Sequence, residues 1–529
     1  MTEKRADPVI RRRYLYLLVF TSGMTTLALE LTASRLLGNV FGTSNVVWAN
    51  VIGLMLVYLS VGYTLGGRIA DRSPHLKTLC KIVAWGAFLS ALIPLIARPV
   101  LQRAASAFVS FEAALAAGSF VAVLILFSLP VTLLGMTSPF AVRLAVTDLA
   151  DAGRVSGRIY AVSTIGSIVG TFLPVLYTIP EWGVTTTFLA FAGVLFVVAW
   201  AGLWWMVGKR AWRYWLMPGL SLVLWLLVGG SVLRAARAEF GLTLIYDDDS
   251  AYNYIQVQQD EAGNRYLYLN EGQGIHSQWH PEIVFYRRTW DYFLAAPYFN
   301  DDFQPQDMRA VLIIGLAAGT IARQHQFIYG DIPIDGLEID GQIIDVGRQF
   351  FGLDGIPTLT AYAEDGRYGL RRLTRSYSLI AVDAYRPPYI PYHLTTVEFF
   401  RELQARLLPD GVVAINVGRT HRDRRLIEAL TNTMQQVFSS VHSMDVLASF
   451  NTILVGTQTE TTPENLLRNA ARLSDDYAVL RTILGWGSAD LVETKANDVL
   501  FTDDRAPLET LIDSLVLGFL LGDGLEVFR

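Results

Sequence analysis

Three acidic residues in the second half of the chain directly follow short apolar runs. Glu338 ends the segment IDGLE, Asp365 follows AYAE, and Asp383 ends SLIAVD. Such runs predict buried strands, which would place each carboxylate at the carboxyl end of a strand. A carboxylate there can accept hydrogen bonds from ribose hydroxyls or take a proton from a nucleophile. It can also cap the helix that follows, but the succession of such positions favours a nucleoside site.

A turn of small residues precedes these acidic residues. In RAVLIIGLAAGTIARQ an apolar run ends at Gly315, and a helical pattern follows Gly319. Small residues at a strand–turn–helix junction let a cofactor approach the backbone. Glu338 comes about twenty residues later, at the spacing typical of a ribose-binding acid. Strands and helices alternate from here on, which predicts a doubly wound, Rossmann-like α/β domain over residues 301–529.

A small β-domain is expected just before the α/β domain. The segments YNYIQVQQ and RYLYLN alternate in polarity on either side of DEAGN, which is a hairpin signal. We assign this β-hairpin domain to residues 240–300. Candidates for binding a substrate lie in its later part and in the loop from residue 385 to residue 393: Glu271, Gln273, His276 and Tyr385.

Residues 1–239 form a different kind of domain, with about seven α-helices that each cross a membrane. A transmembrane helix needs about 20 apolar residues, and stretches near that length occur at 14–36, 46–67, 78–97, 114–136, 158–179, 184–207 and 214–233. Lys and Arg gather in the N-terminal segment and in every second loop, so we expect a cytoplasmic N-terminus. The chain would be a multi-pass protein of the cell membrane, in contact with lipids. Seven spans put the remainder on the outer side, whereas six or eight put it inside.

Two ionisable residues lie within the first expected span, in LALELTASRLLG. A charge within a membrane is costly and usually has a partner or a function. Glu30 can pair with Arg35 or with a neighbouring helix while Arg35 reaches towards the interface. Alternatively, Glu30 belongs to a site for a polyamine or another cation.

Composition narrows the classes of partner. The formal net charge of −5 argues against nucleic acid as a main partner. Cys80 is the single cysteine, so neither an intrachain disulfide nor a cysteine-rich metal site can form. No second His or acidic residue stands at ligand spacing from His276, and we expect no metal.

The second half of the chain resembles the spermidine synthases over residues 246–515. The segments LALELTASRL and VGYTLGGRIADR also resemble the membrane portion of bacterial proteins fused to a spermidine synthase-like domain. The resemblance implies a small β-domain and a Rossmann-like domain of the class I methyltransferase type. It further implies transfer of an aminopropyl group from decarboxylated S-adenosylmethionine to an amine such as putrescine.

The resemblance assigns roles by position. Glu338 would hold the ribose of the nucleoside, and Asp365 with Gly366 would hold its adenine end. Asp383 matches the family's proton acceptor, which takes a proton from the attacking amine.

Two positions depart from the family pattern. Ala318 stands where the glycine-rich turn of the family has an Asp that binds the amine of the cofactor. Arg386 stands where a second Asp binds the acceptor amine, so a positive charge replaces a negative one. The nucleoside half of the site is therefore better retained than the amine half.

These departures leave two alternatives open. The first is an S-adenosylmethionine-dependent methyltransferase of another substrate. Arg386 favours it, because a guanidinium could bind a carboxylate or a phosphate of that substrate. The second is a protein without enzymatic activity that transports or senses a polyamine or a nucleoside. Glu30 and the seven spans favour it. The expected partners are a small-molecule amine and a nucleoside, and the sequence is compatible with a homo-oligomer.

Overall fold

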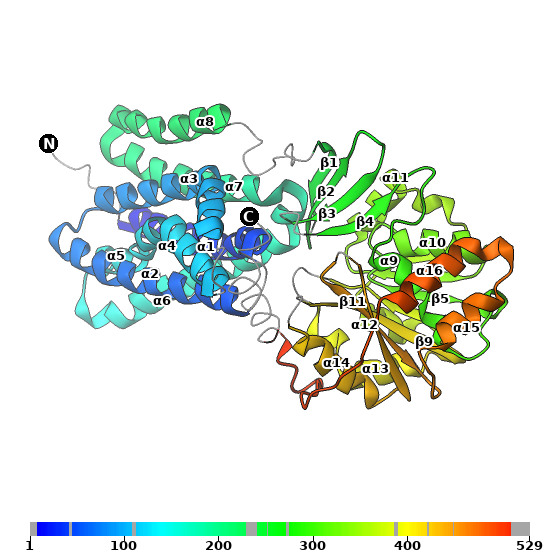
Figure 1. Ribbon diagram of the computed structural model, residues 1–529. Helices are drawn as coiled ribbons and strands as arrows, with labels where there is room; N and C mark the ends of the chain where they lie inside the picture. The colour runs from blue at the N-terminus through cyan, green and yellow to red at the C-terminus, as the bar shows by residue number, and fades with distance from the viewer. Residues whose placement is uncertain are drawn as a thin grey trace. The chain divides into compact units, whose positions relative to one another are not determined.

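The computed structural model describes residues 8–41, 45–107, 113–228, 241–250, 252–270, 274–385, 390–419, 423–447, 449–508 and 511. The chain divides into two compact units (Figure 1). The helical unit comprises residues 1–235 with 249–251, and the α/β unit comprises residues 236–248 with 252–529.

Helices occupy the apolar stretches expected in the first unit as far as these are described, which for 214–233 means up to Val228. They are α1 (Pro8–Phe41), α2 (Asn45–Arg72), α3 (Leu76–Ala107), α4 (Ala113–Gly135), α5 (Thr137–Ala145), α6 (Ala152–Leu173), α7 (Ile179–Val207) and α8 (Leu216–Val228). Short turns link the last three: the π-helical η2 (Pro174–Thr178) joins α6 to α7, and the 3-10 helix η3 (Gly208–Trp215) joins α7 to α8.

Within the described residues, length and composition mark five apolar segments as able to cross a membrane. They are Arg11–Gly38, Val47–Arg72, Leu76–Ala97, Gly118–Ala145 and Leu149–Leu226. The last is 78 residues long and includes α6, α7 and most of α8. This segment is not one straight helix, because Gly183 within α7 has non-helical angles (φ 73°, ψ 174°) and Gly208 after α7 has a φ of 58°. These two breaks lie close to the boundaries expected between 158–179, 184–207 and 214–233.

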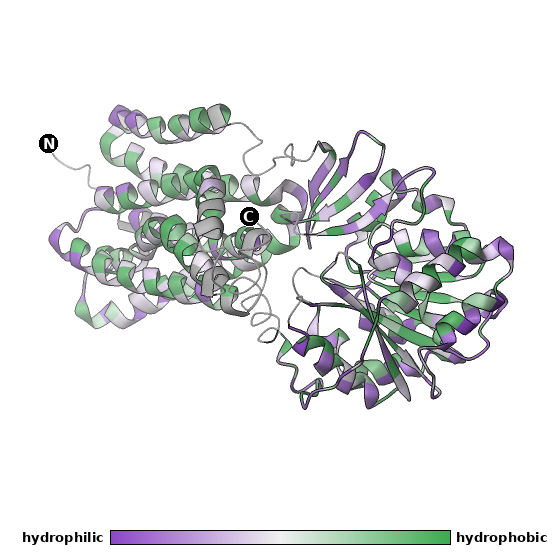
Figure 2. Ribbon diagram, in the orientation of Figure 1, coloured by the Kyte–Doolittle hydropathy of each residue, from purple (hydrophilic) through white to green (hydrophobic). Residues whose placement is uncertain are grey.

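Close packing of two helices supports the membrane character of this unit. A Cβ atom at Gly166 or Gly170 of α6 would overlap the backbone of Phe20 or Met24 in α1. Small residues at such contacts are typical of membrane helices, where van der Waals packing drives association. Figure 2 shows hydrophobic residues along the helices and hydrophilic ones gathered at the end that holds η3.

The α/β unit begins with a four-stranded sheet in the order β1-β2-β3-β4. Its strands are β1 (Thr243–Asp249), β2 (Tyr254–Gln259), β3 (Arg265–Leu269) and β4 (Ile275–Trp279). The hairpin expected around DEAGN is present as antiparallel β2 and β3. One face of this sheet is apolar, and Ile255, Val257 and Leu267 pack there with Ala318 and Val346.

An eight-stranded sheet follows, in the order β12-β10-β11-β9-β8-β5-β6-β7. Its strands are β5 (Val311–Ile314), β6 (Ile334–Glu338), β7 (Leu359–Ala363), β8 (Tyr377–Val382), β9 (Leu407–Gly418), β10 (Ser440–Asp445), β11 (Asn451–Thr457) and β12 (Leu491–Val492). The pairs from β7 to β9 are parallel, whereas β11 is antiparallel to both β9 and β10. This is the Rossmann-like arrangement of the methyltransferase type.

Helices cover both faces of the large sheet. They are α9 (Thr289–Phe293), α10 (Thr320–Tyr329), α11 (Gly341–Phe350), α12 (Gly366–Arg372), α13 (Val397–Gln404), α14 (Arg425–Gln435), α15 (Asn465–Arg472) and α16 (Ala478–Ala489). Val311 and Ile313 of β5 belong to one hydrophobic core, and Leu312 and Ile314 belong to the other. Each such buried side chain contributes about 1.5–3 kcal/mol, so the two cores hold the carboxyl edge of the sheet in place.

Candidate active site

The predicted site residues follow the carboxyl ends of neighbouring parallel strands. The chain continues from β5 to β6 on one side of β5, whereas β8 lies on its other side, so the strand order reverses between β5 and β8. In open α/β sheets ligands bind at such a switch point. The Asp383 amide donates to the Ile314 carbonyl (2.8 Å), which fixes the end of β8 beside the end of β5.

The glycine-rich turn has three residues with positive φ angles. Gly315 and Gly319 have φ angles of 87° and 90°, and Ala317 also lies in the left-handed region at 47°. Glycine adopts such angles without a steric penalty. The Gly315 backbone approaches β8 so closely that a Cβ would stand 2.7 Å from the Ala384 nitrogen.

Glu338 is buried at the end of β6 and points to this turn. Its Oε2 accepts a hydrogen bond from the Ala317 amide (3.0 Å), and its Oε1 accepts one from the Asp340 amide (3.1 Å). Burial raises the pKa of Glu338 to about 7, against the effect of these two donors. Each carboxylate oxygen has a further lone pair, so Glu338 can still accept bonds from ribose hydroxyls.

Ala318 occupies an apolar position next to this turn. It packs with Val257, Val346 and Phe351 in the core of the small sheet, while its amide donates to the Ser277 hydroxyl (3.0 Å). A carboxylate at this place would have to leave that core or be buried in it at a high cost. The position at which Ala318 departs from the family pattern is therefore one where the turn contacts the small sheet closely.

Asp365 caps a helix and also pairs with a histidine. Its Oδ1 caps α12 by accepting from the amides of Arg367 and Tyr368, both at 3.0 Å. Its Oδ2 is paired with the His393 imidazole Nε2 at 3.0 Å. This hydrogen bond, followed by those from the two amides, lowers the pKa of Asp365 to about 2. Asp365 is thus ionised at neutral pH, and Gly366 opens the helix beside it.

Asp383 lies partly buried just after β8. Its Oδ1 accepts a hydrogen bond from the Asn416 amide (2.8 Å), and the Trp290 indole is a further donor. Burial raises the pKa of Asp383 to about 7, against these donors. A carboxyl group whose pKa lies near neutrality suits proton transfer.

Tyr385, two residues after Asp383, also belongs to this region. Its hydroxyl lies near the end of β9, where a Cβ at Gly418 would be 3.5 Å away. Burial and the nearby Asp383 carboxylate both raise the pKa of Tyr385.

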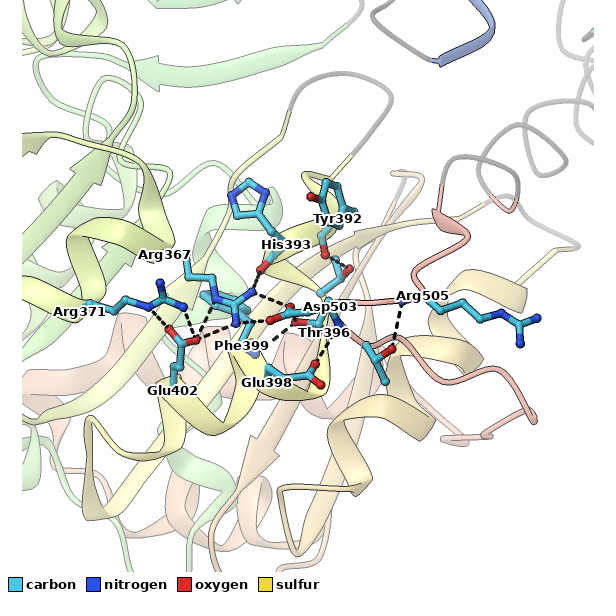
Figure 3. A network of polar contacts seen from close by, with 12 residues as sticks. Arg367, Arg371, Tyr392, His393, Thr396, Glu398, Phe399, Glu402, Asp503 and Arg505 are labelled. Atoms are coloured by element: carbon cyan, nitrogen blue, oxygen red, sulfur yellow. Dashed lines mark hydrogen bonds and ion pairs between the residues drawn. The ribbon is translucent and has the colours of Figure 1, made fainter.

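An ion-pair network lies beside Asp365 (Figure 3). The Arg367 guanidinium contacts both oxygens of Asp503 (2.7 and 2.8 Å) and the Glu402 carboxylate (2.7 Å). It also donates to the His393 carbonyl (3.2 Å), so the histidine that pairs with Asp365 is held at its backbone too. The loop that ends at His393 is thus held by residues of α12 and α13 and by the segment near residue 503.

Sequence reasoning missed Trp290, Asn416 and Arg367. None of them follows a strand in the pattern that identified the carboxylates, because Trp290 and Arg367 belong to helices and Asn416 lies within β9. His393 could be found only as the end of the loop that begins at Tyr385.

The other residues that the sequence indicated for substrate binding are either outside the described residues or buried. Glu271, Gln273 and Arg386 lie outside the described residues. His276 lies in β4, where its Nε2 is buried without a hydrogen-bond partner in the described part of the chain. Burial lowers the pKa of His276 to about 4, so the imidazole is neutral at pH 7. No group of three or more His, Cys, Asp or Glu side chains is placed to hold a metal within the ranges described.

The polar pair in the helical unit is not an ion pair. Arg35 donates from its guanidinium to the Ser250 carbonyl (2.7 Å), and Ser250 belongs to the same compact unit. The expected pairing of Glu30 with Arg35 does not occur among the contacts of the described residues. Glu30 is half-buried in α1.

Part of the chain is similar to known proteins. The spermine/spermidine synthase domain family matches residues 301–455. A probable polyamine aminopropyl transferase of Bifidobacterium longum is 30% identical over 288 residues, which cover 51% of this chain and 62% of that protein. Polyamine aminopropyltransferase 2 of Pseudomonas aeruginosa is 31% identical over 164 residues, or 28% of this chain and 44% of the relative. The matches thus span less than two thirds of either relative.

Among solved structures, a probable spermidine synthase from Corynebacterium glutamicum aligns with a TM-score of 0.39 and 20% identity. The alignment covers 50% of this chain and 99% of the other.

Proposed function

Because residues 301–455 match the spermine/spermidine synthase domain family and the chain is similar to polyamine aminopropyltransferases, we propose that its α/β unit transfers an aminopropyl group from decarboxylated S-adenosylmethionine to an amine. The helical unit would anchor this enzyme in a membrane. One observation carries the proposal: a ribose-competent carboxylate, Glu338, and a base, Asp383, follow strands on either side of β5. This arrangement suits a nucleoside lying across the switch point.

In the proposed reaction an amine nitrogen attacks the aminopropyl carbon that is bonded to the sulfonium. A carbon–nitrogen bond forms, the carbon–sulfur bond breaks, and its electron pair stays on sulfur. The product is a neutral thioether, methylthioadenosine, so the leaving group needs no acid. The amine must lose one proton, and Asp383 would accept it.

Glu338, Gly315 and Gly319 would hold the ribose side of the nucleoside, and Asp365 with Gly366 would lie at its adenine end. His276 and Tyr385 remain candidates for binding the substrate, together with Glu271 and Gln273. Tyr385 is supported by its position two residues from the proposed base and next to Gly418.

Ala318 favours a second candidate, an S-adenosylmethionine-dependent methyltransferase. Its side chain lies in an apolar core where the family has an acid that binds the cofactor amine. A cofactor that relies less on that amine contact would suit the site better, and a methyl group would then be transferred in place of an aminopropyl group.

The test uses the full chain purified in detergent. Calorimetric titrations with decarboxylated S-adenosylmethionine, S-adenosylmethionine and methylthioadenosine measure affinity, and mass spectrometry follows methylthioadenosine release with a panel of amines. We expect the decarboxylated nucleoside to bind more tightly and to yield methylthioadenosine. Binding of S-adenosylmethionine alone, with S-adenosylhomocysteine as product, would support the methyltransferase. No binding of any of the three would reject both proposals.

A further inference from the structure

A chain of polar side chains leads from the edge of the sheet to Asp383. The Ser449 hydroxyl donates to Asn451 Oδ1 (2.8 Å), and Asn451 Nδ2 donates to Asn416 Oδ1 (2.7 Å). Asn416 Nδ2 then donates to Asp383 Oδ1 (2.8 Å). These residues come from β8, β9, β11 and the loop before β11, so the chain crosses three adjacent strands.

The antiparallel pairing of β9 with β11 brings the two amides together. Asn451 is directly opposite Gly418, which places it diagonally across from Asn416. Diagonal neighbours on one face of a sheet are within reach of each other's side chains. The strand that departs from the parallel order thus supplies the second residue of the chain.

While Asp383 is ionised, the donors and acceptors of this chain allow only one direction. A side-chain amide has an acceptor oxygen on one side and a donor nitrogen on the other. Because Asn451 donates to the oxygen of Asn416, the nitrogen of Asn416 must face Asp383. A flipped Asn416 would present its oxygen to a carboxylate and lose both hydrogen bonds.

We propose that Asn416 and Asn451 are positioning residues that fix the Asp383 carboxylate in the orientation needed to accept the amine proton. The inference rests on the proposed function, since it names the residues that prepare its base. Asn416 is buried, and a donor to an ionised acceptor is stronger there than in water. The Asn416 bond also favours the ionised form of Asp383, which is the form that can take a proton.

Two other groups of the described residues interact with Asp383, and neither of them changes its charge near pH 7. Trp290 of α9 donates to Asp383 but does not titrate. Tyr385 is the titratable neighbour that interacts with the Asp383 charge among the described residues, and its pKa is raised, so it stays neutral near pH 7. A pH-dependent change that follows a substitution at Asn416 is therefore attributable to Asp383.

The first test compares pH–rate profiles of Asn416→Leu and Asn451→Leu with the unmodified protein, all as full chains. Loss of the donor should move the acid limb of kcat/KM upward by roughly 0.5–1 pH unit and lower kcat about tenfold, with nucleoside affinity within about twofold. Asn451→Leu should shift the limb in the same direction but less, because Asn416 then loses only its orientation. An unchanged acid limb in both variants would overturn the proposal.

Asn432→Leu serves as the control. Asn432 is a partly buried amide in α14 that donates to the Val499 carbonyl (3.1 Å), away from Asp383. This variant should show the stability effect of a lost asparagine hydrogen bond without any shift of the acid limb. A shift of the same size in this control would assign the effect to general destabilisation and contradict the positioning role.

A second measurement separates this proposal from the proposed function. ¹³C NMR of carboxyl-labelled aspartate, with the Asp383 signal assigned by its absence in Asp383→Asn, reports the ionisation of this group without turnover. Asn416→Leu should move the Asp383 titration to higher pH even if no amine gives product. An unmoved titration would reject the amide chain whether or not the enzyme is active.

Discussion

The backbone of Gly315 lies against that of Asp383, and a Cβ at position 315 would stand 2.5 Å from the Asp383 carbonyl oxygen. The turn expected to hold the nucleoside and the proposed base are therefore in direct backbone contact. No side chain separates them, so a displacement of one is transmitted to the other. The identity of residue 315 as glycine thus bears on binding and on proton transfer together.

Gly315→Ala is expected to destabilise the α/β unit more than Gly330→Ala. Both glycines have positive φ angles (87° and 68°), but a Cβ at Gly330 meets nothing within 4 Å. The control should therefore show only the conformational cost of about 1–3 kcal/mol, whereas Gly315→Ala adds a clash with the Asp383 carbonyl. Thermal unfolding of the two full-length variants measures the difference. Equal losses would mean that the contact between the turns relaxes easily.

Glu338→Gln should weaken methylthioadenosine binding at least tenfold, which is about 1.4 kcal/mol. The amide nitrogen cannot accept hydrogen bonds from ribose hydroxyls, and it would face the Ala317 or Asp340 amide donor. Calorimetric titration measures the change. Asp335→Asn is the matched control, because Asp335 is a buried acid on the same strand that bonds to Tyr377 (2.9 Å). Its loss should affect stability but leave nucleoside affinity unchanged.

Asp383→Asn should stabilise the folded protein at pH 8 while abolishing most turnover. The pKa of Asp383 is about 7 in the folded chain and about 3.9 when unfolded. Between these values the folded state binds a proton that the unfolded state has lost, so the contribution of Asp383 to stability falls as pH rises from about 4 to 7. The melting temperature gained by the variant should be largest above pH 7 and vanish near pH 4. A gain that does not depend on pH would contradict the shifted pKa.

Arg367→Ala should cost much more stability than Arg371→Ala, although both arginines bind Glu402. The Arg367 side chain is 9% exposed and that of Arg371 is 59% exposed. Removing one partner of a buried ion pair typically costs about 3–5 kcal/mol, and Asp503 keeps part of its hydration here, which places the expected loss near the lower end. Arg371→Ala should leave the unfolding midpoint unchanged in a denaturant titration. Similar midpoints for both variants would show that the network in Figure 3 is dispensable.

A reporter that is active only in the cytoplasm, fused after Arg529, tests the topology. With a cytoplasmic N-terminus and seven crossings we expect little activity from this fusion. The same reporter placed after Lys209 in the basic η3 turn should be strongly active, because positively charged loops face the cytoplasm. Strong activity from both fusions would mean an even number of crossings and a cytoplasmic α/β unit.

The fold was predictable wherever one local pattern sufficed. Apolar runs placed β5, β6 and β8, and the small-residue turn at Gly315 showed where β5 meets α10. The hairpin of β2 and β3 followed from the alternation around DEAGN. Each of these signals is confined to a few neighbouring residues, which is the scale at which side-chain periodicity and turn chemistry act.

The contacts that the sequence did not predict depend on pairing between distant segments. Asn416 and Asn451 meet only because β11 inserts antiparallel beside β9, and the sequence carries no mark of that register. Arg367 and Asp503 are 136 residues apart. The pairing of Asp365 with His393 is a similar case, since a helix cap was foreseeable but the partner of its second oxygen was not. In the helical unit, composition located the helices but could not show that α6 continues through the π-helical η2 as far as the break at Gly183.

The docking of the segment around Phe501 and Asp503 has a consequence for the order in which the protein is made. Phe501 is buried in the core beside α13, and its carbonyl accepts from the Val397 amide (3.0 Å). A ribosome adds about 5–20 residues per second, so roughly tens of seconds separate the synthesis of α8 from that of Asp503. The helical unit, for which we propose a place in a membrane, would have this interval in which to insert. The α/β unit, in contrast, stays incomplete until Asp503 has been made, so termination before that residue would yield the helical unit without a finished α/β unit.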